Sequence, residues 1–166
     1  LNACRLIYGN KKIFKSINVE TRKAAEGIDD ILKVASPHID NITIGRTDLS
    51  RSYFDEKIQP DSKFIQDIII SLVQKVTAAG LSFTVGGSIS RDSIECFHSR
   101  PKEWLRQITN LETRKVILPT NIMLENEEAL KESIKFEELY LHFKIGVEEL
   151  MISSDKERFA KLKERL

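Results

Sequence analysis

The chain of 166 residues is long enough to bury the core of one ordinary domain. Its apolar fraction of 41% and charged fraction of 31% are those of a globular protein and exclude disordered and fibrous classes. A net charge of +1 gives no electrostatic basis for binding nucleic acid. Neither a spanning apolar run of roughly 20 residues nor a signal peptide is visible, so we expect a cytoplasmic protein without membrane or nucleic acid partners.

Strand patterns and helix patterns alternate along the chain. Strands are predicted where β-branched residues cluster, and helices where apolar residues recur at helical spacing. The predicted elements are a helix end at residues 1–8, a strand at 13–19, a helix at 22–34, a strand at 41–44, a loop at 45–60, a helix at 61–79 closed by Gly80, a strand at 81–85, a short helix at 90–98 capped by Ser88 or Ser90, a strand within 104–118, a helix from 127 to about 151, and a final charged helix capped by Ser154 or Asp155. The fourth strand has two candidate cores, residues 108–111 and 116–118, which the pattern leaves open.

This alternation predicts the α/β class, with βα units, a parallel sheet and right-handed crossovers. Both an open sheet and a closed barrel have that order. Four βα units are half of a TIM (β/α)8 barrel, which needs about 250 residues. Because the chain also begins inside a helix pattern, we expect residues 1–125 to be the C-terminal half of such a barrel, strands five to eight. Residues 126–166 are expected to be a C-terminal helical extension that serves in oligomerisation.

Chemically active residues follow three successive predicted strands, where ligands collect in parallel α/β folds. These are Glu20, the turn Gly45-Arg46-Thr47-Asp48, and Gly86-Gly87. Neighbouring strands lie about 4.8 Å apart, so carboxylates at adjacent strand ends can share a cation. Oxygen ligands suit Mg²⁺ or Mn²⁺. Glu20 and Asp48 are therefore the candidate metal ligands.

Such an ion keeps open positions for a keto acid and stabilises the charge of its enolate as a Lewis acid. We expect Gly45 to let the backbone approach the substrate, and the amides of Thr47 and Asp48 to donate to its carboxylate. Arg46 is a candidate for holding an anionic substrate, as are Arg51 and Arg91.

Simpler interpretations stand beside these. An acid after a strand is often a helix cap or a first-turn charge. Gly86-Gly87 is a tight turn or a phosphate-binding loop before a helix. Cys4 and Cys96 are expected to be buried free thiols. The string Glu-Thr-Arg-Lys occurs at 20–23 and again at 112–115; its unlike surroundings favour coincidence over an internal repeat.

Several segments together resemble one family. Residues 19–21, 27–32 and 39–50, with the sequences VET, GIDDIL and IDNITIGRTDLS, resemble the signature of the HpcH/HpaI aldolase and citrate lyase beta-subunit family. Residues 83–90, 111–116 and 134–137 resemble a bacterial branch of it known only as aldolase/citrate lyase-like.

The resemblance implies a TIM barrel and a divalent-metal-dependent carbon-carbon lyase, acting through a metal-stabilised enolate of a keto acid or an acyl-CoA-type substrate. It implies Glu20 and Asp48 as ligands of Mg²⁺ (or Mn²⁺), and Gly45, Arg46, Thr47 and Asp48 as the substrate-binding turn. It also implies a homo-oligomer, a trimer or hexamer, in which C-terminal helices are often exchanged between subunits.

One departure qualifies this expectation. The family's catalytic arginine and its proton-transfer groups belong to the first half of the barrel, and nothing in this chain matches them. The segment alone is therefore expected to be inactive. The alternative is a non-catalytic, barrel-derived oligomerisation or interaction protein.

Overall fold

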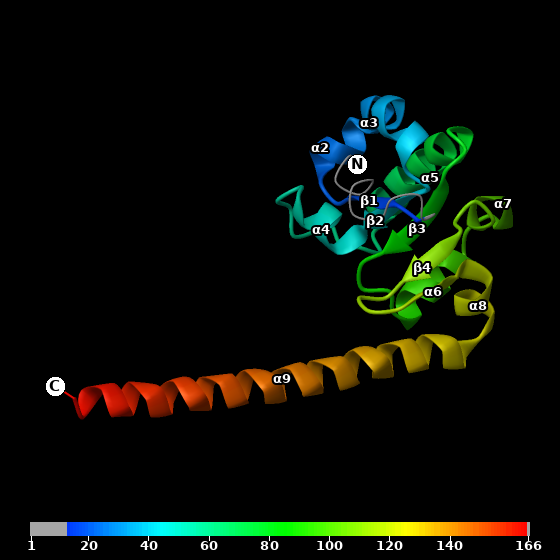
Figure 1. Ribbon diagram of the computed structural model, residues 1–166. Coiled ribbons are helices and arrows are strands. Elements are labelled where there is room, and N and C mark those ends of the chain that lie inside the picture. The colour runs from blue at the N-terminus through cyan, green and yellow to red at the C-terminus, as the bar shows by residue number, and fades with distance from the viewer. Residues whose placement is uncertain (1–12, 166) are drawn as a thin grey trace.

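The computed structural model describes residues 13–165 (Figure 1). The helix end predicted at residues 1–8 and the thiol of Cys4 lie outside these residues. Five strands form one sheet in the order β1 (Ser16–Val19), β2 (Asn41–Gly45), β3 (Ser82–Gly86), β4 (Asn110–Glu112) and β5 (Ile117–Pro119). The pairs from β1 to β4 are parallel, and β5 runs antiparallel to β4. The expected α/β class is therefore confirmed.

The register brings the carboxyl ends of the parallel strands to one end of the sheet. Ile44 of β2 pairs with Val19 of β1 and with Val85 of β3, which in turn pairs with Leu111 of β4. One step further along, Gly45 pairs with Gly86. Residues that follow these strands therefore meet at the same place.

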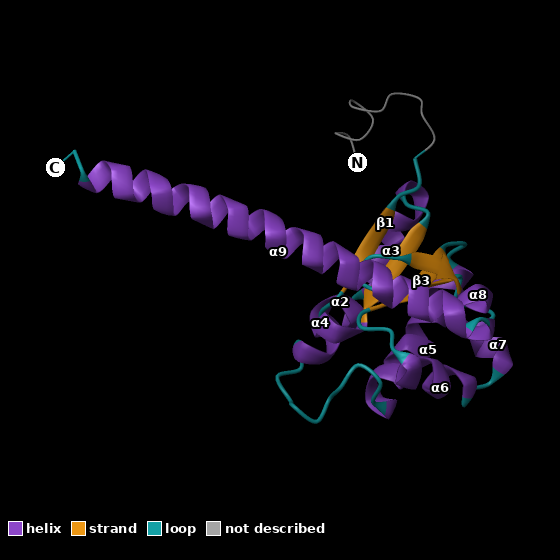
Figure 2. Ribbon diagram, turned by 90° about the horizontal axis from the view of Figure 1, so that it is seen from below, coloured by secondary structure: helices purple, strands orange, loops and turns teal. Residues whose placement is uncertain are grey.

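The helices follow the strands in βα order. Their bounds are α2 (Arg22–Glu26), α3 (Ile28–Ala35), the 3₁₀ helix η1 (Ser36–His38), α4 (Arg46–Arg51), α5 (Lys63–Ala78), α6 (Arg91–His98), α7 (Lys102–Leu105), α8 (Thr120–Glu125) and α9 (Glu127–Lys163). Figure 2 shows α5 and α6 lying near each other on one side of the molecule, while α9 extends away from it.

The core lies between the sheet and α5, which contacts β3 and α3. Strand β2 is buried along its whole length, as a strand covered on both faces must be. The apolar face of α5 presents side chains that are all at most 3% exposed: Ile65, Ile69, Leu72, Val73 and Val76. This burial anchors α5 on the sheet.

Helix starts follow the capping rules. Thr21 accepts a hydrogen bond from the amide of Ala24, and Ser62 accepts one from the amide of Ile65. Ser90 forms a capping box with Ser93, which selects Ser90 over Ser88 as the cap of α6. Gly80, at φ +76°, follows α5 as predicted.

Three local predictions differ from the structure, and one open alternative is resolved by it. The helix predicted at 22–34 is two helices that meet at Gly27. The predicted loop 45–60 contains α4. Both candidate cores of the fourth strand contribute, because β4 and β5 form a hairpin. The separate final helix was wrong, since α9 runs unbroken past Ser154 and Asp155.

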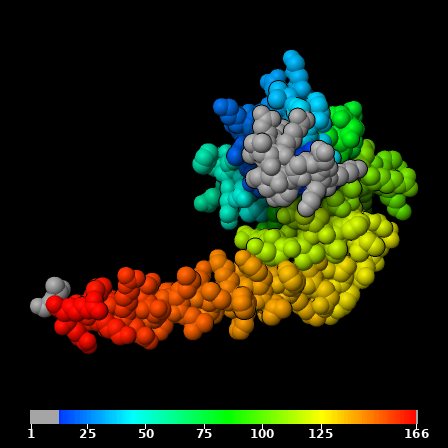
Figure 3. All heavy atoms as spheres, viewed as in Figure 1, coloured from blue at the N-terminus to red at the C-terminus, as the bar shows by residue number. Residues whose placement is uncertain are grey.

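Helix α9 leaves the body of the molecule. Its first turns pack beside α8, and its second half stands clear in the space-filling view (Figure 3). Among residues 13–165, no helix combines the length and the apolarity that crossing a bilayer requires.

Candidate functional site

A pocket of about 360 Å³ lies at the carboxyl ends of the parallel strands. It is lined by Asn18, Glu20, Thr43, Gly45, Thr47, Asp48, Arg51, Gly86, Gly87, Glu112, Thr113 and Arg114. The structure thus brings together most of the candidates that the sequence offered, while Arg46 and Arg91 do not line the pocket.

Glu20 folds back over the end of the neighbouring strand β2. A Cβ atom on Gly45 would lie 2.6 Å from Oε1 of Glu20 and 2.7 Å from its Cγ. Asn18 donates from Nδ2 to Oε1 of the same carboxylate, at 3.2 Å. The space that glycine leaves at position 45 is therefore filled by the carboxylate of Glu20, whereas the sequence had suggested substrate there.

Glu112, at the end of β4, lies in the same way over Gly86, at the end of the neighbouring strand β3. A Cβ atom on Gly86 would lie 3.3 Å from Cβ and 3.4 Å from Oε2 of Glu112. Because Gly45 and Gly86 are register partners, the two glutamates converge over the ends of the two central strands. Burial, and then the charge of Glu20, raise the pKa of Glu112.

Glu112 was missed as a site residue in the sequence. The fourth strand had two candidate cores, so its carboxyl end was not assigned. The duplicated Glu-Thr-Arg-Lys string contained the signal, because each copy begins with a glutamate that follows the buried part of a parallel strand. The copies then diverge: Arg22 begins α2, whereas Arg114 lies in the turn between β4 and β5.

Asp48 reaches the same pocket from the first turn of α4. Its side chain is 62% exposed, and its Oδ1 lies 3.8 Å from Nη1 of Arg51. The distance is too long for a hydrogen bond, and an exposed pair of this kind contributes little to stability. The carboxylate of Asp48 is therefore accessible to a ligand in the pocket.

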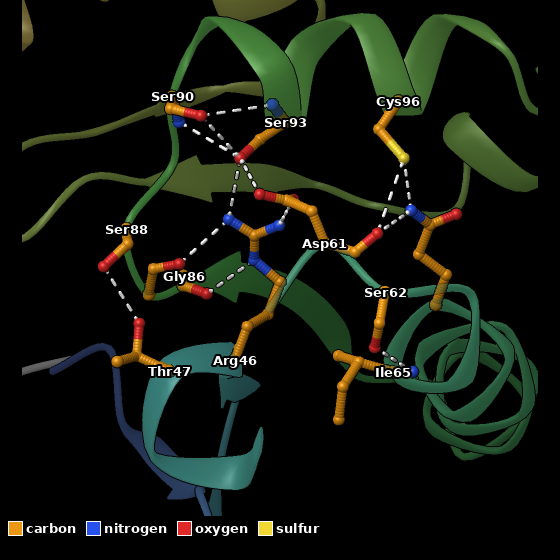
Figure 4. Close-up of polar contacts among 12 residues, drawn as sticks. Arg46, Thr47, Asp61, Ser62, Ile65, Gly86, Ser88, Ser90, Ser93 and Cys96 are labelled. Atoms are coloured by element: carbon orange, nitrogen blue, oxygen red, sulfur yellow. Dashed lines mark hydrogen bonds and ion pairs between the residues drawn. The ribbon is translucent and has the colours of Figure 1, made fainter. Parts of the chain in front are cut away.

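Arg46 is buried, and its side chain points toward Asp61, Ser93 and the turn after β3 (Figure 4). Its Nε donates to the carbonyl of Gly86 at 3.1 Å, and its Nη2 donates to the carbonyl of Gly87 at 2.9 Å. Its guanidinium also pairs with Asp61 and contacts Oγ of Ser93. Burial lowers the pKa of Arg46, and the charge of Asp61 opposes that shift. Arg46 thus holds the backbone of the Gly86-Gly87 turn.

The Gly86-Gly87 turn packs directly on the start of α4. Gly87 has φ +86°, and a Cβ atom there would lie 2.7 Å from the backbone nitrogens of Arg46 and Thr47. Oγ1 of Thr47 donates to Oγ of Ser88 at 3.0 Å (Figure 4). The double glycine therefore serves as a close contact between two strand-end segments, and its carbonyls are taken by Arg46.

Two arginines complete the lining of the pocket. Arg51 is 73% exposed, and Arg114 is 60% exposed and lies 3.9 Å from Glu137 of α9. Both ion pairs are longer than a hydrogen bond. The pocket therefore combines carboxylates with two cations whose present partners bind them weakly.

The carboxylates supply only oxygen donors. Within residues 13–165, no three side chains of His, Cys, Asp or Glu come together as a metal-binding group. Cys96, expected to be a buried thiol, is half-buried and unpaired, and contacts Gln66 and the carbonyl of Asp61. Glu20 and Asp48 can therefore hold a cation only as a two-carboxylate site that leaves other ligand positions to water or substrate.

In comparisons with known proteins, no family model and no curated protein matches the chain.

Proposed function

We propose that this chain carries the metal-binding part of a divalent-metal-dependent carbon-carbon lyase of the aldolase/citrate lyase type. The observation that carries the proposal is that Glu20, Gly45, Thr47 and Asp48 line one pocket at the ends of parallel strands. These are the residues through which the chain resembles the HpcH/HpaI aldolase and citrate lyase beta-subunit family. Pockets in parallel α/β folds form at this end of the sheet.

The residues present fit a hard divalent ion. Glu20 and Asp48 would hold Mg²⁺ or Mn²⁺, both of which prefer oxygen ligands. Glycine at position 45 supports this role, because any larger residue would displace the carboxylate of Glu20. When bound, the ion supplies a Lewis acid for the enolate of a keto acid or of an acyl-CoA-type substrate.

The chain's own groups would then bind and orient the substrate. Thr47 and Asp48 line the pocket at the start of α4, and their amides would donate to the carboxylate of the substrate. Arg46 positions the neighbouring Gly86-Gly87 turn through two carbonyls. Arg51 and Arg114 line the same pocket, and their positive charges would offset the negative charges of the glutamates and of an anionic substrate.

In this proposal, β1 to β4 are strands five to eight of a TIM barrel. The support is four parallel strands in sequential order with helices between them. In the structure, β5 pairs with residues 110–112 along the outer edge of β4. In a closed barrel, that edge would pair with the first strand. Closure therefore requires β5 to release that edge to a parallel strand from another segment.

The remaining catalytic groups would come from that other segment, so the chain alone is proposed to be inactive. The complete enzyme is proposed to be a homo-oligomer, a trimer or hexamer, with a small keto acid or acyl-CoA-type substrate.

Titration calorimetry with MgCl₂ and MnCl₂ tests the metal site without requiring turnover. We expect saturable binding by the wild-type chain and its loss in the double variant Glu20→Gln, Asp48→Asn. The matched control is Asp92→Asn with Glu103→Gln, two exposed acids outside the pocket. Binding that survives the pocket variant, or that the control abolishes equally, overturns the proposal.

One observation favours the non-catalytic alternative, an oligomerisation or interaction protein derived from a barrel. Helix α9 exposes many large apolar side chains, as the surface of an interaction protein does. This alternative expects no metal binding at Glu20 and Asp48, so the same titration separates the two functions.

A further inference from the structure

Helix α9 is far longer than the surface available to it. Its 37 residues span about 55 Å at 1.5 Å per residue. Leu130 and Ser133 are buried, but from residue 141 to residue 165 every side chain position except Gly146 is exposed. Figures 1 and 2 show this part of the helix extending away from the body in both views. A helix gains most of its stability from packing an apolar face, so this part requires a partner.

The apolar residues of α9 form two stripes. The body-side stripe continues the face that packs on the body, and it consists of Leu130, Ile134, Leu141, Ile145 and Ile152. The outer stripe consists of Phe136, Leu139, Phe143, Val147 and Leu150. At 3.6 residues per turn, the two stripes lie about 180° apart. Every side chain of the outer stripe is between 40% and 73% exposed.

The spacing of the outer stripe indicates what covers it. Its residues follow one another at intervals of 3, 4, 4 and 3 residues. This is the periodicity by which helices pack on other helices along a narrow seam. Any second molecule of this chain carries the same long, exposed helix and can therefore supply the partner. A closed pair between identical surfaces is the commonest form of assembly.

The charge along α9 gives the direction of pairing. Residues 127–149 contain seven glutamates and three lysines, whereas residues 150–163 contain four basic residues and two acids. A parallel pair would place like charges side by side. An antiparallel pair places the acidic part of each helix beside the basic part of the other, which favours that orientation.

The area is of the right order for a specific pair. An aromatic side chain buries roughly 150–250 Å². At 40–73% exposure the five side chains of the outer stripe supply on the order of 500 Å², so the helix flanks beside them supply the rest of the roughly 800 Å² per partner of a standard interface. Monomeric proteins rarely leave so much contiguous apolar surface in water.

We propose that the outer stripe of α9 pairs with the outer stripe of a second copy, antiparallel, about a two-fold axis near residues 143–147. Of the two assemblies proposed above, such a pair fits the hexamer, which can contain two-fold axes, and not the closed trimer. Gly146 lies beside that axis, and a Cβ atom there would meet nothing within 4 Å in the single chain. The inference does not depend on the metal site, since no residue of the outer stripe lines that pocket.

Sedimentation velocity on the full chain tests the pairing. We expect the wild type to associate, and Phe143→Glu with Val147→Glu to raise the dissociation constant by more than about a hundredfold. The matched control, His142→Glu with Ser153→Glu, adds the same two charges between the stripes and keeps the association. A monomeric wild type, or equal association of both double variants, overturns the proposal.

Disulfide cross-linking tests the orientation, in a background with Cys4→Ser and Cys96→Ser. Gly146→Cys is expected to cross-link two copies, because the axis brings this position close to itself. Leu162→Cys is expected not to cross-link, since its two copies would lie about 50 Å apart. Cross-linking through position 162, or none through position 146, contradicts the antiparallel pair.

Discussion

Glu20 and Glu112 approach each other across two strands that carry neither residue. Each lies over a glycine of the adjacent central strand, and these glycines, Gly45 and Gly86, are paired in register. Burial raises the pKa of Glu112, and the nearby charge of Glu20 raises it further. Two glycines at matched positions thus create the room in which the pocket's acids meet.

Replacing Gly45 tests whether that room is needed. In Gly45→Ala, the new Cβ atom would lie 2.6 Å from Oε1 of Glu20, so the carboxylate must move out of the pocket. We expect Mg²⁺ affinity to fall by at least about tenfold, the equivalent of roughly 1.4 kcal/mol. Calorimetry measures the affinity. Gly86→Ala is the matched comparison; its closest contact of 3.3 Å predicts a smaller effect, and equal effects would contradict the geometry.

The raised pKa of Glu112 predicts a pH dependence of stability. The folded chain binds a proton at Glu112 more tightly than the unfolded chain does. This favours folding below the ordinary glutamate pKa of about 4.3, and the advantage is lost as the pH rises through the raised pKa.

Glutamine at position 112 cannot ionise, so Glu112→Gln should gain stability relative to wild type between about pH 3.5 and pH 7. Urea denaturation at the two pH values, in a chelating buffer, measures this difference. A variant whose stability relative to wild type is the same at both pH values would show that Glu112 does not experience the predicted environment.

Arg46 is predicted to stabilise the fold. Arg46→Met removes the donors to the carbonyls of Gly86 and Gly87 and leaves Asp61 without its cation. We expect a loss of about 2–4 kcal/mol in the free energy of unfolding. The control Arg91→Met breaks an exposed pair with Glu95 at 3.5 Å and should cost less than about 1 kcal/mol. Similar losses in both variants would mean that Arg46 is not the anchor of the turn.

Alanine substitutions at Gly87 and Gly80 separate the cost of backbone strain from the cost of a steric clash. Both have positive φ, so alanine is strained at either position. Only at Gly87 would the new Cβ atom also meet backbone nitrogens at 2.7 Å, whereas at Gly80 it would meet nothing within 4 Å. Gly80→Ala should cost about 1 kcal/mol and Gly87→Ala clearly more, as thermal unfolding would measure. A smaller cost at Gly87 would contradict the packing of the turn on α4.

Short sequence patterns predicted the elements that depend mainly on nearby residues. The β-branched run before Gly45 and the apolar face of α5 located the central strand and its covering helix. Helix α4 was missed because six residues are too few for a helical period to appear. The continuity of α9 was missed because Ser154 and Asp155 favour caps, although neither prevents a helix from continuing.

The site depended on contacts that span the chain. Glu20 and Asp48 were located because each follows a predicted strand. Arg46 was assigned to the substrate, but its acceptors come from residues 86–87 and its counter-ion is Asp61, which no local pattern connects. Glu112 was hidden because the hairpin of β4 and β5 is set by pairing between strands of three residues each.

Paramagnetic broadening by Mn²⁺ tests the metal site most directly, because it locates the ion as well as detecting it. In amide spectra of the labelled chain, small additions of Mn²⁺ should broaden the resonances of Glu20, Gly45 and Asp48 first and leave those of α7 and the end of α9 sharp. Excess Mg²⁺ should restore them, and the Glu20→Gln, Asp48→Asn variant should show no selective loss. Broadening centred elsewhere, or unchanged in that variant, would contradict a metal site between Glu20 and Asp48.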